Sequence, residues 1–110
     1  MFPDGFATKV DVPSVTLESF IHSTGISKIN LLKIDAEGAE YPILLSSPAS
    51  VFKKIEKIYV EYHDYIDHGH RVETLVKFLQ QNGYDIERSG NFFNIYHRFF
   101  HAGFLKAYKR

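Results

Sequence analysis

Three acidic side chains stand close together where an apolar run of the sequence ends. The stretch LLKIDAEGAEYPILL places Asp35, Glu37 and Glu40 around Gly38, between a strand-like run and a helix-like run. Carboxylates in such a turn can accept hydrogen bonds from an amine or a hydroxyl, or act as a general base. Negative charge at a helix N-terminus is the alternative role, and it stabilises by about 0.3–1 kcal/mol. That alternative suits Glu40 better than Asp35, which precedes the predicted helix.

A second polar pair, Glu61 and His63, ends the strand-like run IEKIYVEYHD. In open parallel sheets, ligands bind outside the carboxyl ends of the strands. If the strands that end at Asp35 and at Glu61 are neighbours, about 4.8 Å apart, their polar side chains meet at one edge of the sheet. The alternation of a strand also places Glu61 and His63 on one face, and Asp35 and Glu37 on one face if the chain stays extended.

Periodicity and end signals predict the elements that position these residues. Thr16 is the expected N-cap of a short helix that stops at Gly25. Residues 28–35, KINLLKID, show little alternation, which predicts a strand buried on both faces. The helix that begins near Gly38 tolerates Pro42 only if this proline lies in its first turn.

The second half of the sequence continues this alternation of helices and strands. Its predicted elements are a helical turn at 47–54, a strand at 55–64, an amphipathic helix at 70–82 and a β-hairpin around Ser89, Gly90 and Asn91. A further extended segment is expected at 6–12. The order β-α-β-α-β-β predicts an α/β fold whose parallel sheet carries an antiparallel edge.

Composition excludes several classes of protein. The 110 residues suffice for one domain, 1–110, and the 13 basic and 13 acidic residues produce no field that favours nucleic acid or an anionic membrane. No apolar run approaches the roughly 20 residues that span a bilayer. Cysteine is absent, which fits a reducing compartment. With no signal-peptide pattern at the start, a cytoplasmic location is expected.

The same residues resemble the FkbM family of S-adenosylmethionine-dependent methyltransferases. The resemblance covers roughly 10–97 and rests on VTLESFI, on NLLKIDAEGAE and on VEYH; Glu18 and Asn30 stand where the family often has aspartate. It implies a Rossmann-like methyltransferase sheet and methyl transfer to a hydroxyl of a small molecule or a sugar. It also implies catalytic roles for Asp35, Glu61 and His63, and cofactor contacts by Asp35 and Glu37.

The resemblance also indicates a part of the family's fold that this sequence lacks. No glycine-rich strand-turn-helix element is present, and the seven glycines are scattered. The matching motifs are those of strands four to seven with the closing hairpin, so the chain is similar to the C-terminal half of the domain. We therefore expect S-adenosylmethionine binding and activity by this chain alone to be weak or absent. The strand at 28–35 would expose an edge open to self-association or to a missing N-terminal half.

Two other groups of residues offer different functions. A His/Asp cluster in the predicted loop after the second strand would suit a metal-dependent hydrolase, but its spacing matches no known ligand motif; it comprises His63, Asp64, Asp67, His68 and His70. The aromatic and basic C-terminal residues could bind single-stranded nucleic acid or a membrane, although packing of a hairpin explains them better. A non-catalytic α/β interaction module is the alternative to the methyltransferase, and no metal site is predicted.

Overall fold

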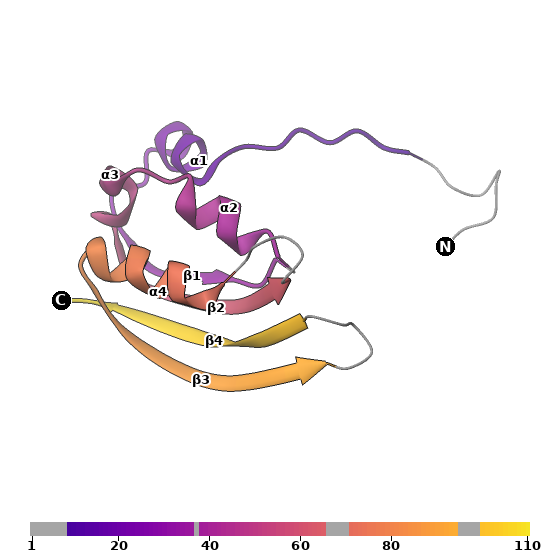
Figure 1. Cartoon of the computed structure of the whole chain (residues 1–110). Coiled ribbons are helices and arrows are strands. Elements are labelled where there is room, and N and C mark those ends of the chain that lie inside the picture. The colour runs from indigo at the N-terminus through magenta and orange to yellow at the C-terminus, as the bar shows by residue number, and fades with distance from the viewer. Residues whose placement is uncertain (1–8, 37, 66–70, 95–99) are drawn as a thin grey trace.

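The computed structural model describes residues 9–36, 38–65, 71–94 and 100–110, and shows an α/β fold (Figure 1). Its helices are α1 (Leu17–Thr24), α2 (Glu40–Leu45), α3 (Ala49–Phe52) and α4 (Val72–Gln81). Its strands are β1 (Ile29–Ile34), β2 (Ile55–Tyr65), β3 (Tyr84–Asn94) and β4 (Phe100–Lys109). Within these ranges no helix is both long and apolar enough to cross a bilayer.

The strands form one mixed sheet in the order β1-β2-β4-β3. β1 and β2 are parallel, with Ile34 opposite Val60, while β4 is antiparallel to both β2 and β3. The predicted α/β class and the predicted combination of parallel and antiparallel strands are therefore confirmed. The parallel β1–β2 pair brings the carboxyl ends of both strands to the same edge of the sheet.

Local signals in the sequence explain several helix ends. The Thr16 hydroxyl accepts a hydrogen bond from the Ser19 N–H at 3.0 Å, and Gly25 ends α1 with φ of 69°. This left-handed conformation is open to glycine without the steric penalty of a Cβ. Pro42 is the third residue of α2. N–H groups in the first turn of a helix have no acceptor within the helix, so the missing N–H of proline costs no hydrogen bond there. The predictions for both helices are confirmed.

The four helices of the described residues pack on one face of the sheet. The alternating residues Ile58, Val60 and Tyr62 of β2 are almost fully buried, and so are Leu105 and Ala107 of β4. They join one core with apolar side chains from the helices, namely Ile21, Tyr41, Leu44, Val51, Phe52, Val72, Leu75 and Leu79. Figure 1 shows the helices gathered on this side of the strands.

The other face of the sheet is open within the described part of the chain. It carries Tyr59, Glu61, Phe104 and Lys106, and Phe104 and Leu31 are 42% and 48% exposed. The prediction that 28–35 is buried on both faces is therefore wrong for this chain: only Ile34 of β1 is buried. β1 ends the described sheet, so one of its edges and one of its faces have no covering element.

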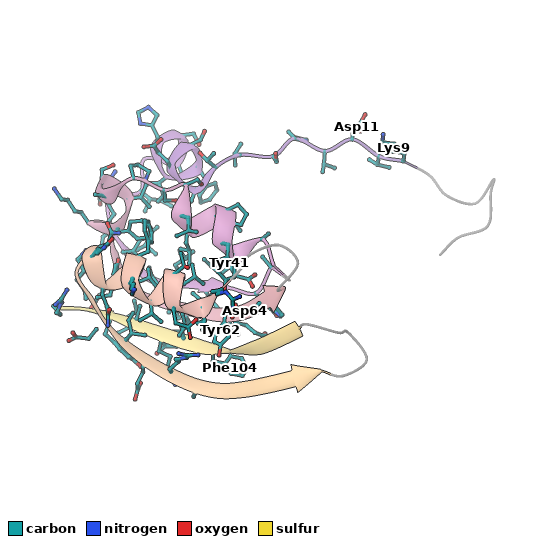
Figure 2. All side chains as sticks on the ribbon, in the orientation of Figure 1. Lys9, Asp11, Tyr41, Tyr62, Asp64 and Phe104 are labelled. Atoms are coloured by element: carbon teal, nitrogen blue, oxygen red, sulfur yellow. The ribbon has the colours of Figure 1, made fainter. Side chains whose placement is uncertain are left out.

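The extended segment expected at 6–12 does not cover this edge where it is described. Residues 9–16 form no strand, and Val10 and Val12 are 70% and 76% exposed. Figure 2 shows Lys9 and Asp11 on a segment that runs away from the sheet. Residues 6–8 lie outside the described ranges.

The predicted hairpin exists, but its turn lies elsewhere. Ser89 and Gly90 lie inside β3, at a register shift against β4 that is typical of a β-bulge. Gly90 has φ of 69°, so its glycine signal marks the bulge rather than the turn. The last residue of β3, Asn94, pairs with the first residue of β4, Phe100. The C-terminal residues Phe100–Lys109 form β4 between β2 and β3, which agrees with the packing of a hairpin.

Tyr84 anchors the start of β3 in the core, and its ionisation should couple the stability of the fold to alkaline pH. Its hydroxyl lies 2.9 Å from the carbonyl oxygen of Phe52 and 2.5 Å from that of Ile55, and the side chain is fully buried. Burial raises the pKa of Tyr84 to about 12.

We expect the free energy of unfolding to fall between pH 10 and pH 12, in part because Tyr84 ionises. The folded-state pKa lies above that of an unfolded tyrosine, so the contribution is complete below about pH 10 and is lost as pH rises to about 12. The loss amounts to about 2–3 kcal/mol. Urea unfolding from pH 9 to pH 12 measures it, and Tyr84→Phe should flatten the profile by that amount. Identical pH profiles for the two proteins would contradict this role.

Candidate functional site

Three polar side chains meet at the carboxyl ends of β1 and β2. Asp35 directly follows β1, and Glu61 and His63 belong to the last part of β2. One ligand atom from each residue lies within 4.8 Å of those of the other two. Asp35 is exposed, Glu61 is half-buried and His63 is only 4% exposed. The structure thus brings together three of the four residues proposed from the sequence; Glu37 lies outside the described residues.

Glu40 contacts both the backbone and the ring of His63. Its Oε1 lies 2.9 Å from Nδ1 of His63 and accepts the His63 backbone N–H at 2.6 Å. An ionised Glu40 can only accept at this position, which assigns the proton to Nδ1 and leaves Nε2 as the ring atom on the side of the cluster. This Nε2 lies 3.9 Å from Oε1 of Glu61.

This role of Glu40 was not predicted from the sequence. A helix-terminal charge is normally solvated, whereas the Glu40 side chain is fully buried. Its spacing from Asp35 is equally compatible with an exposed charge in the first turn of α2, so the sequence held no signal for the contact. The contact exists because β2 runs parallel to β1 and carries His63 beneath the start of α2.

Gly38 completes the turn between β1 and α2. Its φ of 102° is a conformation that residues with a Cβ rarely adopt. The Gly38 N–H donates to Oε2 of Glu40 at 2.9 Å. Glu40 therefore accepts hydrogen bonds on both carboxylate oxygens, from Gly38 and from His63. The glycine between the acids of the turn serves this arrangement.

Asp64, the neighbour of His63, has a structural role. One carboxylate oxygen accepts a hydrogen bond from the Tyr41 hydroxyl, and the other accepts the Val72 N–H at 3.0 Å. Val72 begins α4, so Asp64 satisfies a helix N–H that has no partner within the helix. Burial and the bond to Asp64 raise the pKa of Tyr41. Figure 2 shows Tyr41 and Asp64 together between α2 and the end of β2.

This structural role of Asp64 bears on the proposal that the His/Asp cluster of 63–70 binds a metal. Inside the fold, His63 contacts Glu40 and Asp64 contacts Tyr41. The other members of that cluster, Asp67, His68 and His70, lie outside the described residues. No metal site is proposed for that loop.

A hollow of about 380 Å³ adjoins the three-residue cluster on the open face of the sheet. Tyr59 and Phe104 supply apolar walls, Lys33 and Lys106 supply positive charge, and Asp35 and Glu61 lie at the carboxyl end of the strands. Lys106 stands 5.5 Å from the centre of the Tyr59 ring, a cation–π contact. Small-molecule sites commonly enclose about 300–1,000 Å³, so this hollow is of adequate size for a small ligand.

A parallel β-α-β unit with polar residues at the carboxyl ends of its strands is the arrangement of Rossmann-like α/β proteins. Comparison with known protein families shows which family of these proteins the chain belongs to. The chain belongs to the methyltransferase FkbM domain family, which matches residues 2–86. The resemblance stated from the motifs is thus confirmed.

Comparison with characterised proteins adds one relative. The chain is similar to the AMB antimetabolite synthetase AmbE of Pseudomonas aeruginosa, with 32% identity over 72 residues. The match covers 64% of this chain and 3% of the synthetase. The chain thus corresponds to a small part of that protein. No solved structure matches it.

Proposed function

We propose that this chain is the acceptor-side half of an S-adenosylmethionine-dependent O-methyltransferase. The observation that carries the proposal is the meeting of Asp35, Glu61 and His63 at the carboxyl ends of β1 and β2, in a member of the FkbM family. S-adenosylmethionine supplies the methyl group when it is bound. In this proposal the three side chains orient an acceptor hydroxyl and help to remove its proton.

The residues present fit only one part of the cofactor. The carboxylates of Asp35 and Glu37 are suited to its ammonium or amino groups, but the sequence holds no glycine-rich turn to carry its nucleoside end. We propose that a glycine-rich segment outside this sequence completes the site, from the same polypeptide or from another chain. The open edge of β1, with Leu31 half exposed, is where such a segment would add strands.

The acceptor is proposed to be a small molecule or a sugar that enters the hollow beside the cluster. The walls of Tyr59 and Phe104 suit an apolar or ring-shaped body, and the acids lie where a hydroxyl would approach. We propose a cytoplasmic location for the reaction, which the absence of cysteine fits. A non-catalytic module that self-associates through β1 is the alternative, and the same exposed edge supports it.

Methyl transfer by the completed protein tests the proposal. The assay follows a tritiated methyl group from S-adenosylmethionine to a library of small hydroxyl compounds and sugars. It uses this chain together with its glycine-rich segment. We expect Asp35→Asn to lower kcat/KM at least about 100-fold, because groups that assist proton transfer contribute about 10²–10⁴-fold. Since Asp35 is exposed, the melting temperature should hardly change.

Glu87→Gln is the matched control for this assay. Glu87 is an exposed acid of β3, opposite Lys106, and it does not line the hollow. Its replacement removes one negative charge from the same sheet and should keep kcat/KM within threefold. Equal activity of Asp35→Asn and the wild type would refute the catalytic role. Label transferred only to nitrogen would refute O-methylation.

A further inference from the structure

We propose that Asp35, Glu61 and His63 together bind a divalent transition-metal ion, which would lie at the point where the acceptor hydroxyl is activated. The inference rests on the same residues as the proposed function and deepens it. Its starting point is that three potential ligand atoms, from two adjacent parallel strands, lie within 4.8 Å of one another.

The distances require the donors to move closer before they can share one ion. Two ligands bound at about 2.1 Å to a tetrahedral ion lie about 3.4 Å apart. The donors here span up to 4.8 Å, so the widest pair must approach by about 1.4 Å. Asp35 is exposed after the end of β1 and can make that movement. His63 is held in the fold and cannot move as far.

The orientation of His63 is the second observation, and it is independent of the acids in the cluster. A histidine that binds a metal usually donates its other ring N–H to a carboxylate, which fixes the tautomer and the ring plane. Glu40, fully buried and outside the cluster, does this at Nδ1 with a distance of 2.9 Å. Nε2 is thereby left on the side of Glu61, at 3.9 Å from its carboxylate.

The donor set indicates the class of ion. One imidazole with two carboxylates suits Mn²⁺, Fe²⁺ or Zn²⁺ better than Mg²⁺ or Ca²⁺, which favour oxygen ligands alone. Three protein ligands leave further positions open to water or to a substrate oxygen, as in catalytic metal sites. An acceptor hydroxyl bound there would lose its proton to solvent water at the open face more readily, because the cation stabilises the oxyanion that remains.

Binding of Mn²⁺ alone tests the inference without any methyl transfer. The electron paramagnetic resonance signal of free Mn²⁺ falls as the ion is bound, so titration of the chain gives the dissociation constant. We expect binding below about 1 mM by the wild type, and at least 10-fold weaker binding by Asp35→Asn. Glu40→Gln should weaken binding by about 10–100-fold, as loss of a carboxylate behind a metal-binding histidine typically does.

The controls separate a specific site from general attraction by acids. Glu87→Gln should bind Mn²⁺ within twofold of the wild type. Mn²⁺ should also raise the melting temperature of the wild type but not that of Asp35→Asn, whose melting temperature without metal shows that it is folded. Absence of binding up to 1 mM, or equal weakening in Asp35→Asn and Glu87→Gln, would overturn the metal site. Either result would leave the methyl-transfer assay to decide the proposed function separately.

Discussion

Replacing Glu40 with leucine should lower the free energy of unfolding by about 3–5 kcal/mol. The substitution removes the acceptor for the N–H groups of Gly38 and His63 and for Nδ1 of His63. Each buried donor left without a partner costs about 1–3 kcal/mol, and part of that cost is relieved by water where Gly38 is half exposed. Urea unfolding at neutral pH measures the loss.

Glu18→Leu is the matched control for Glu40→Leu. Both residues are acids in the first turn of a helix, but Glu18 is exposed. If Glu40 acted only through the positive end of α2, the two substitutions would cost about the same, 1 kcal/mol or less. A loss for Glu40→Leu no larger than that of Glu18→Leu would show that the buried contact with His63 contributes little. It would also count against a role of Glu40 in positioning His63 for a ligand.

Gly103→Ala should cost about 3 kcal/mol of unfolding free energy, at the upper end of the usual range for added volume in a packed core. A Cβ at Gly103 would collide with the carbonyl oxygen of Gly90 and with the Tyr62 hydroxyl, and would lie 2.7 Å from Cζ of Tyr62. The Gly90 contact is backbone, which cannot move without disturbing the bulge in β3. Urea unfolding again measures the loss.

Two comparisons make this prediction specific. Gly25→Ala adds a methyl group where no atom lies within 4 Å, so its cost comes only from φ of 69° and should be about 1–2 kcal/mol. Adding Tyr62→Leu to Gly103→Ala should recover part of the packing strain, although the Gly90 contact remains. If Gly103→Ala costs less than Gly25→Ala, the close approach of β3, β4 and Tyr62 is looser than the structure indicates.

The local elements were largely predictable because short-range rules govern them. Thr16 and Gly25 set the ends of α1 by capping, and periodicity predicted the amphipathic helix at 70–82 that the structure shows as α4. The failure at Ser89 and Gly90 has an equally local cause. A glycine with positive φ serves a bulge as well as a turn, and only pairing with β4 distinguishes the two.

The site could be predicted in part, because strands alternating with helices indicated a parallel sheet. Asp35 follows β1 and Glu61 lies in the last part of β2, so the pairing of these neighbouring parallel strands had to bring the two side chains together. Glu40 could not be assigned, because burial of a carboxylate depends on what packs over it. The same holds for Asp64, whose partners come from α2 and α4.

The sequence by itself determined the family, the order of the elements and the acids at the ends of β1 and β2, because motifs, caps and periodicity are properties of neighbouring residues. The tertiary structure alone decided the insertion of β4 between β2 and β3 and the open face of the sheet. It also decided the contact between Glu40 and His63. These features depend on strand pairing and burial between segments far apart in the chain, whose free energy no local pattern records.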